Sequence, residues 1–362
     1  MKIAIISFTL AQGGSQRFVY EHAVEFKKKG HECFVITKKS KDGFYVGQLE
    51  KAGVRVLGEL GRRIVFSRVR WLKLTRLLHS FFSLLDFLMV QPWKYDLVLV
   101  SQIESYSLLS AYRPWVRNAI VILMSHKFQY PRDPYSGIKE KMRVYLMDDK
   151  QKRELVESGV DFEYVQYPLS LRVSDFPAVE YAEGSNRIGY FARLSPERPV
   201  EFIFFALHLL KNKSPDVVLH IFGRGELSFE QRRILKILGV ERDVIFEGHA
   251  QSIPDAIREK NISAVWLTCY GNTLGFGAIE MMAHRAPLIL WNLDPSVRPS
   301  SFLADHDLER FVEKTVQVLA DPVFASHYIR NHYLYVSDNC DVAENSSKLI
   351  EFSMRSRPEV IR

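Results

Sequence analysis

Hydrophobic and polar positions alternate along the chain in two successive series of strand and helix patterns. In the first series, the apolar run KIAIIS predicts a buried strand, GGSQRFVYEHAVEFKKKG an amphipathic helix, and HECFVIT a second strand. Further strands are indicated at residues 54–57, 96–101 and 119–124, with a long helix near residues 69–90. The first half is therefore predicted to be one α/β domain that begins with a βαβ unit.

The second series follows residues 169–185, a stretch without sustained periodicity that is typical of a linker. Its strands are predicted at RIGYFA, VVLHIF, DVIFEG, SAVWLT and PLILW, and its helices near residues 200–210, 227–238, 254–260 and 277–284. Five short strands with intervening helices favour a second parallel sheet, wound like a dinucleotide-binding fold. We expect a domain at residues 1–168, a second at 185–340, and a C-terminal helix at 341–362 that packs toward the first domain.

The composition, with 47% hydrophobic and 25% charged residues among 362, is that of an ordinary globular protein. The three cysteines, Cys33, Cys269 and Cys340, lack metal-ligand spacing and favour a reducing compartment, so a cytoplasmic location without an export signal is expected. His79, Asp86 and Lys94 interrupt the most apolar stretch, so no membrane-spanning helix is predicted.

The net charge of +7 is unevenly distributed, because residues 1–150 hold 25 Lys and Arg against 13 Asp and Glu. A basic segment precedes an apolar stripe and contains Arg62, Arg63, Arg68, Arg70, Lys73 and Arg76. The stripe favours core packing, while the basic residues are either solvated or bind anionic lipid headgroups or a lipid-diphosphate acceptor. No nucleic-acid-binding module accompanies this charge, so nucleic acid is not expected as a partner.

The segment from Gly271 to Trp291, GNTLGFGAIEMMAHRAPLILW, is the most informative part of the sequence. Gly275 and Gly277 would let backbone N–H groups approach a phosphate at the start of a helix, and Glu280 could accept hydrogen bonds from ribose hydroxyls. The segment therefore indicates a nucleotide-sugar site, although an ordinary helix start with a satisfied glutamate has the same pattern.

Three further features follow predicted strands, where doubly wound sheets bind their ligands. Gly13 and Gly14 lie between the first strand and the first helix, where they either approach a phosphate or make a tight turn. Arg193 and Arg198 follow RIGYFA and could bind a diphosphate, or could be solvated surface residues. His126 follows the strand at residues 119–124 and is either structural or directed to a cleft between the domains.

The order of GGSQRFVYEHAVEFKKKGHECFVIT, ARLSPER, LHIFGRGE, VIFEGHA and NTLGFGAIEMMAHRAPLI resembles glycosyltransferase family 4, the retaining enzymes of GT-B fold. This resemblance implies two Rossmann-like doubly wound domains facing a central cleft, with the acceptor in the first and the nucleotide-sugar donor in the second. It also implies roles for individual residues. These are donor binding by Gly13, Gly14, Arg193, Arg198, His249, Leu274, Gly275, Phe276 and Glu280, and catalytic positions at His126 and Asn272.

The sequence departs from the family pattern at several of these positions. Asn272 replaces the glutamate expected eight positions before Glu280, which removes a negative charge that normally contacts the sugar. Arg198 stands where lysine is usual, and Arg285 where glycine is usual in a turn from helix to strand. These changes make an unusual donor or a reduced activity plausible.

The resemblance implies transfer of a sugar to a glycan or lipid-linked acceptor during synthesis of a surface polysaccharide, lipopolysaccharide or glycolipid. The leaving diphosphate would help to deprotonate the acceptor hydroxyl. No cofactor and no metal are expected, because arginines would neutralise the phosphate. The alternative, suggested by Asn272, is a catalytically weak nucleotide-binding subunit that partners another glycosyltransferase.

Overall fold

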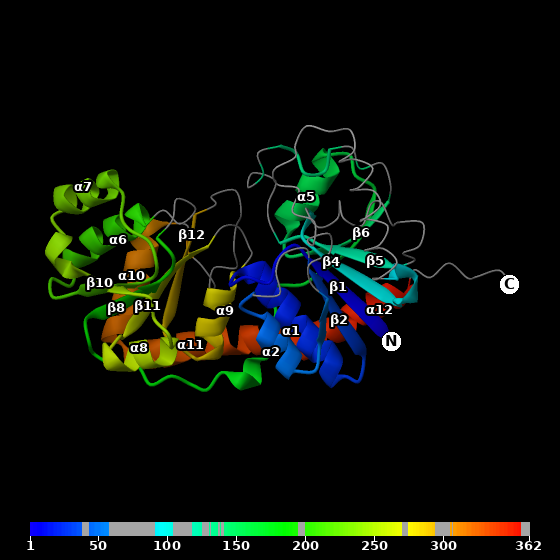
Figure 1. Cartoon of the computed structure of the whole chain (residues 1–362). Helices are drawn as coiled ribbons and strands as arrows, with labels where there is room; N and C mark the ends of the chain where they lie inside the picture. The colour runs from blue at the N-terminus through cyan, green and yellow to red at the C-terminus, as the bar shows by residue number, and fades with distance from the viewer. Residues whose placement is uncertain are drawn as a thin grey trace, which may run out of the picture. The chain divides into compact units, whose positions relative to one another are not determined.

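The computed structural model describes residues 1–37, 43–57, 91–103, 118–124, 130, 132–136, 138, 141–194, 200–269, 274–293, 305 and 307–355. The chain divides into two compact units (Figure 1). Unit 1 contains Met1–Ser170 together with Val342–Arg362, and unit 2 contains Leu171–Asp341. Each unit has a parallel β-sheet with helices on its faces, so the predicted α/β class of both halves is confirmed.

The sheet of unit 1 has the strand order β3-β2-β1-β4-β5-β6-β7, and all its described neighbours are parallel. The strands are β1 (Lys2–Ser7), β2 (Glu32–Thr37), β3 (Arg55–Leu57), β4 (Leu97–Ser101), β5 (Ala119–Ile122), β6 (Met142–Leu146) and β7 (Phe162–Gln166). The sequence patterns predicted the first five strands but not β6 or β7. The order reverses between β1 and β4, which creates the switch point typical of doubly wound sheets.

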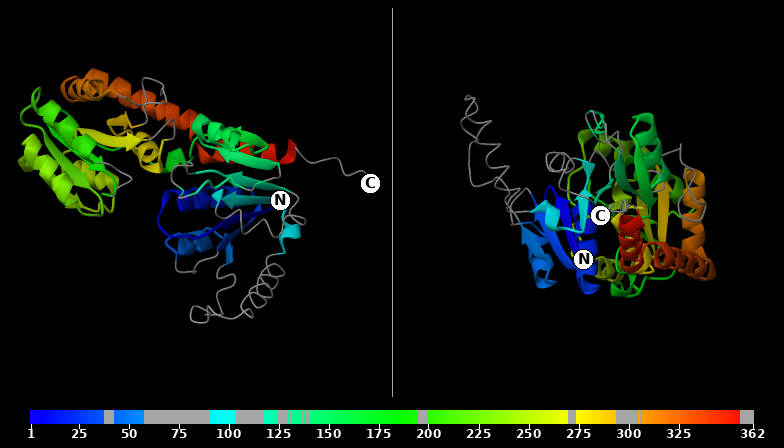
Figure 2. Two further views of the ribbon diagram at one scale, coloured as in Figure 1. Left: turned by 90° about the horizontal axis from the view of Figure 1, so that it is seen from above. Right: turned by 90° about the vertical axis from the view of Figure 1, so that its right-hand side faces the viewer.

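The described helices of unit 1 are α1 (Gly14–Lys28), α2 (Val46–Lys51), α5 (Asp149–Glu157) and α12 (Val342–Arg355), with a short 3-10 turn, η1 (Pro92–Lys94). α1 buries Phe18, Val19 and Phe26 against the sheet. The last helix, α12, packs beside α1, as the red and blue ribbons of Figure 2 show. The long helix predicted near residues 69–90 lies outside the described residues.

Polar contacts attach both ends of α12 to the rest of unit 1. Near the start of α12, Lys29 Nζ donates to Ala343 O at 2.6 Å. Near its end, the Arg143 guanidinium, on β6, donates to the carbonyls of Phe352 and Ser353. Because a helix leaves its last carbonyls without intrahelical donors, Arg143 satisfies these acceptors, and Asn118 Nδ2 also donates to Ser353 O at 3.1 Å.

The sheet of unit 2 has the order β10-β9-β8-β11-β12, again with parallel neighbours. Its strands are β8 (Arg187–Phe191), β9 (Val218–Phe222), β10 (Val244–Gly248), β11 (Ala264–Cys269) and β12 (Leu288–Asn292). Its helices are α6 (Glu201–Lys211), α7 (Phe229–Leu238), α8 (Ile253–Glu259), α9 (Phe276–Ala283), α10 (Leu308–Ala320) and α11 (Pro322–Asn339), with 3-10 turns η4 (Val173–Asp175) and η5 (Glu241–Asp243). All five strands and four helices predicted for the second series are present.

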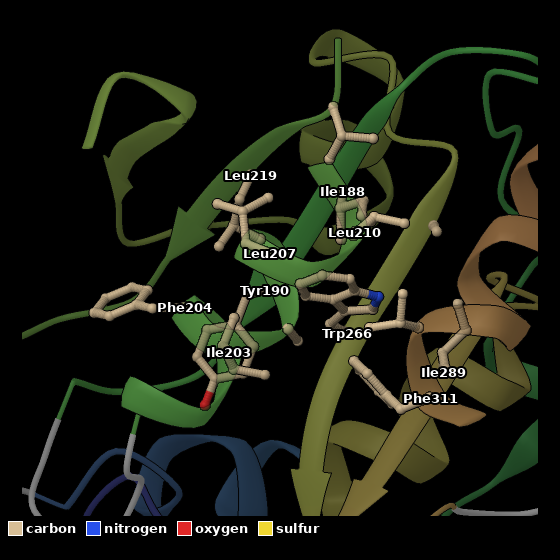
Figure 3. Packing of buried hydrophobic residues seen from close by; sticks show 14 of the residues in the cluster. Ile188, Tyr190, Ile203, Phe204, Leu207, Leu210, Leu219, Trp266, Ile289 and Phe311 are labelled. Atoms are coloured by element: carbon tan, nitrogen blue, oxygen red, sulfur yellow. The ribbon is translucent and has the colours of Figure 1, made fainter. Parts of the chain in front are cut away.

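The core of unit 2 lies between one face of its sheet and helices α6, α7 and α10. Trp266 of β11 is fully buried there, with its ring centroid 5.1 Å from that of Phe311 (Figure 3). Its indole Nε1 donates to Thr315 Oγ1 at 3.0 Å, so the one polar atom of this side chain is paired. Burial of a large aromatic side chain with its N–H satisfied stabilises this face of the sheet and fixes the strands that lead to the site.

Local signals explain where individual helices start and stop. Ser228 and Gln231 form a reciprocal capping box at the start of α7, and Gly239 ends the same helix in the left-handed conformation at φ 68°. Within the described part of the chain, no helix is long and apolar enough to cross a membrane.

Candidate functional site

The carboxyl edge of the unit 2 sheet is built from loops that continue the hydrogen bonding of the strands. Ala192 N donates to Phe222 O at 3.0 Å, and Leu194 N donates to Arg224 O at 2.9 Å. On the other side of β9, Gly223 N donates to Gly248 O at 2.7 Å. The loops after β8, β9 and β10 are therefore joined to one another beyond the ends of their strands.

Two glycines in the loop after β9 permit this close approach. A Cβ atom on Gly223 would lie 1.9 Å from Ala192 O, and one on Gly225 would lie 2.2 Å from Leu194 O. Gly225 also has a φ of +115°, a conformation that side chains disfavour. These glycines belong to the GRGE stretch that carries part of the family resemblance, but only their spatial neighbours show why glycine is required at both positions.

Arg193 lies at this edge, two residues after the end of β8, and its side chain is exposed. This is the location that the sequence predicted for an anion-binding arginine at the end of RIGYFA. Arg224, which was not among the residues predicted from the sequence, is exposed on the adjacent loop. Its available signal was its position between two glycines immediately after a predicted strand.

α9 brings the main elements of the sequence prediction together. Gly275 is its N-cap in an extended conformation, and Gly275 O accepts the N–H groups of Ala278 and Ile279 at 3.0 and 3.2 Å. No acidic residue lies in the first turn, and apart from its chain neighbours and the α9 backbone no described atom lies within 4 Å of a Cβ position on Gly277. The positive end of the helix dipole therefore has access to an anionic ligand.

Glu280 lies in the second turn of α9 and is half-buried. Its neighbours Ile279, Met281 and Met282 are fully buried, and Leu274 and Phe276 are almost fully buried. The helix therefore packs tightly against the rest of its unit. The structure thus places a carboxylate about one turn from the helix N-terminus, close in sequence and space to the predicted phosphate-binding backbone.

The C-terminal end of α9 is held by two other segments of unit 2. His284 Nδ1 lies 2.8 Å from Pro177 O, and Val179 N donates to His284 O at 2.7 Å. Arg285 has a φ of 57°, the left-handed conformation usual for glycine after a helix, and its guanidinium carbon lies 4.3 Å from the Tyr333 ring centroid. This cation–π contact offsets part of the backbone cost of arginine at that position.

His249 is exposed after β10, next to Gly248, which has a φ of +75°. Immediately before it, Glu247 pairs with His220 Nδ1 at 2.8 Å and with Lys260 Nζ at 2.6 Å. Burial raises the pKa of Glu247, but the hydrogen bonds from Lys260 and His220 outweigh this effect and lower it. Glu247 therefore carries a negative charge that ties β10 to β9 and to the end of α8.

In unit 1, Gly13 is the N-cap of α1 and Gly14 is the first helical residue, directly beyond β1 and its loop. Gly13 O accepts Arg17 N at 2.9 Å, and no acidic residue occupies the first turn. The pair thus opens a helix at the switch point of its sheet, the position at which such folds bind anions.

Several predicted residues lie outside the described part of the chain: His126, Arg198, Asn272 and the basic residues Arg62, Arg63, Arg68, Arg70, Lys73 and Arg76. Among the described residues, no three His, Cys, Asp or Glu side chains gather in a group that could hold a metal ion. The predicted residues that the structure describes in unit 2 follow three of its strands: Arg193 follows β8, His249 follows β10, and the α9 segment from Leu274 to Glu280 follows β11.

Comparisons with known proteins point to one enzyme class. The family model described as glycosyl transferases group 1 matches residues 185–321, which includes β8 to β12. A curated relative, poly(ribitol-phosphate) alpha-N-acetylglucosaminyltransferase of Staphylococcus aureus (strain COL), is 19% identical over 194 residues. That match covers 51% of this chain and 38% of the relative, so it spans less than half the length of the relative.

Solved structures resemble the whole chain. Anabaena HepE in complex with UDP and glucose superposes with a TM-score of 0.73 at 15% identity, covering 99% of this chain and 100% of HepE. A point mutant of S. aureus TarM in complex with Fondaparinux, alpha-GlcNAc-glycerol and UDP gives a TM-score of 0.70 at 11% identity, covering 98% and 99% of the two chains. The chain therefore has the GT-B fold that the sequence resemblance implied.

Proposed function

We propose that this protein is a glycosyltransferase that takes a sugar from a nucleotide-sugar bound by unit 2. The observation that carries this proposal is the carboxyl edge of the unit 2 sheet, where exposed Arg193 follows β8 and the N-terminus of α9, with Glu280 in its second turn, follows β11. The match of the glycosyltransferase family model to this same unit, and the UDP held by the HepE and TarM structures, support it.

Within this proposal, each group has a separate task. Arg193 and the first N–H groups of α9 bind the diphosphate and stabilise the negative charge that grows on it as the bond to the sugar breaks. Glu280 accepts hydrogen bonds from the ribose hydroxyls and fixes the nucleoside. Arg198, five residues further along the chain than Arg193, adds a second positive charge, and the backbone near His249 meets the nucleobase.

The finer parts of the proposal follow the family resemblance. The sugar keeps its anomeric configuration, and the departing diphosphate takes the proton of the acceptor hydroxyl, so that no separate carboxylate base is needed. His126 and Asn272 contact the transferred sugar, and the reaction requires no metal. These roles rest on motif positions.

The acceptor is proposed to be a surface glycan or lipid-linked saccharide, in keeping with the name of the S. aureus relative, a poly(ribitol-phosphate) N-acetylglucosaminyltransferase. The basic segment from Arg62 to Arg76 would bind the anionic face of the membrane where such acceptors are held. Co-sedimentation with vesicles should then require anionic lipid and weaken with salt, because screening shortens the reach of surface charges. Equal binding to neutral vesicles would refute this part.

A nucleotide-binding experiment tests the assignment of the pocket. A thermal-shift screen with UDP, GDP and dTDP selects the nucleotide, since a ligand that binds the folded state raises its apparent stability. Glu280→Ala should then weaken binding of a ribonucleoside diphosphate by about 10- to 100-fold, given about 1.5–3 kcal/mol for a charged hydrogen bond. It should leave binding of the 2′-deoxy analogue much less affected. Equal losses for both analogues would remove Glu280 from the ribose site.

A turnover experiment tests the enzymatic part. Purified protein should release the nucleoside diphosphate from one nucleotide-sugar, slowly with water alone and faster with acceptor. If it binds nucleotides but neither transfers nor hydrolyses any nucleotide-sugar, the protein is the nucleotide-binding partner subunit considered from the sequence.

A further inference from the structure

Two neighbouring strands of unit 2 are in a register that extends to the loops beyond them. Phe191, the last residue of β8, lies opposite Phe222, the last residue of β9. Their rings stack with centroids 4.4 Å apart and planes inclined by 8°. Opposite residues at this edge therefore have side chains that lie side by side on one face of the sheet.

The backbone hydrogen bonds carry this register two residues further. Ala192 N donates to Phe222 O, and Leu194 N donates to Arg224 O, so Arg193 comes to lie opposite Arg224. Gly223 keeps the two loops close, because a side chain there would collide with Ala192 O. Arg193 and Arg224 are thus on adjacent backbones about 5 Å apart, the usual strand separation.

The alternation along each strand shows that both arginines leave the sheet on the same face. Ile188 and Tyr190 of β8 are buried in the core of Figure 3, and Ala192 and Leu194 pack against it, so Arg193 belongs to the opposite face. On β9, Leu219 and Ile221 are in that same core. The same alternation places Arg224 on the face opposite the core, beside Arg193.

Two exposed positive charges side by side repel each other unless an anion lies between them. Within the described part of the chain, neither guanidinium has a hydrogen-bond or ion-pair partner. Arg193 follows β8, which flanks the switch point between β8 and β11, and Arg224 follows the adjacent strand β9; ligands of doubly wound folds bind beyond such strand ends. Planar guanidinium groups match the oxygen geometry of phosphates.

We propose that Arg224 is a second diphosphate-binding arginine, which holds the donor together with Arg193. This inference rests on the proposed function and adds a residue to its pocket. Arg224 neutralises charge on the diphosphate in the bound donor and as the sugar departs, so it contributes to nucleotide affinity through the phosphates and not through the nucleoside.

The test compares Arg224→Ala, Arg193→Ala and a matched control, Arg232→Ala, which removes an exposed arginine from α7 of the same unit. Calorimetry measures binding of UDP and of uridine, or of whichever nucleoside diphosphate a thermal-shift screen selects and its nucleoside. Arg224→Ala should weaken binding of the nucleoside diphosphate about tenfold and leave binding of the nucleoside unchanged. Arg224→Lys should recover part of the loss, because it restores the charge but not the planar pair of donors.

The outcomes separate this inference from the proposed function. Suppose that Arg193→Ala lowers the affinity for the nucleoside diphosphate, while the Arg224→Ala variant has the same affinity as the Arg232→Ala control. The role of Arg224 is then refuted and the nucleotide pocket stands. If Arg224→Ala weakens nucleoside and diphosphate equally, its effect is on the structure of the edge and the inference is also refuted. If the unaltered protein binds no nucleoside diphosphate, the proposed function itself fails.

Discussion

Substitution of Gly223 by alanine tests whether the joined loops of unit 2 depend on their close approach. The new Cβ would lie 1.9 Å from Ala192 O, whereas real Cβ atoms essentially never come within 3.0 Å of such an atom. The loops must therefore separate by about 1.1 Å, which would lengthen the bond from Ala192 N to Phe222 O, now 3.0 Å, beyond hydrogen-bonding range.

The expected cost follows from the contacts that are lost. Ala192 N and Leu194 N make one hydrogen bond each across the two loops. Loss of both costs about 1–3 kcal/mol, and the forced shift adds about 1–3 kcal/mol of packing strain. We therefore expect the free energy of unfolding to decrease by about 2–6 kcal/mol.

Urea unfolding followed by tryptophan fluorescence measures this change. Gly277→Ala is the matched control for stability, because apart from its chain neighbours and the α9 backbone no described atom lies within 4 Å of its Cβ position, and alanine is the better helix former. Its unfolding midpoint should stay unchanged or rise slightly. If Gly223→Ala unfolds at the same urea concentration as the unaltered protein, this contact does not constrain the loops. The inference that the close approach of the loops holds Arg193 opposite Arg224 is then wrong.

Two further predictions concern charged groups away from the proposed pocket. Because hydrogen bonds from Lys260 and His220 lower the pKa of Glu247 despite its burial, its contribution to stability is present above the usual value of 4.5 and is lost as the pH falls through its lowered pKa. Acid titration of the unfolding midpoint should thus show a steeper decline for the unaltered protein than for Glu247→Gln; parallel curves would contradict this. Arg143→Ala should cost about 2 kcal/mol and speed hydrogen exchange at the end of α12, since charged donors to Phe352 O and Ser353 O are lost. Arg355→Ala, on the exposed side of the same helix, is its control, and equal exchange in the two variants would argue against the Arg143 anchor.

Local sequence patterns were sufficient for most of the fold and part of the site. KIAIIS and PLILW are runs of apolar residues long enough only for buried strands, and GFGAIEMMAH combines a glycine start with helical spacing. The patterns did not predict β6 and β7, because MRVYL contains an arginine and FEYVQ, at the edge of its sheet, has no buried residue and no regular alternation. Only the tertiary structure explains the arginine at position 143 within a strand, because its guanidinium donates to carbonyls at the end of α12.

The sequence by itself determined the two parallel α/β sheets, the glycine-led α9 with Glu280, and an arginine directly after β8, because each depends on neighbours along the chain. Only the tertiary structure decided that Gly223 must lack a side chain and that Arg224 lies opposite Arg193. Those facts depend on which loops meet across the sheet. Residues 193 and 224 are separated by a strand and a helix, so their register is set by long-range hydrogen bonding that no local pattern records.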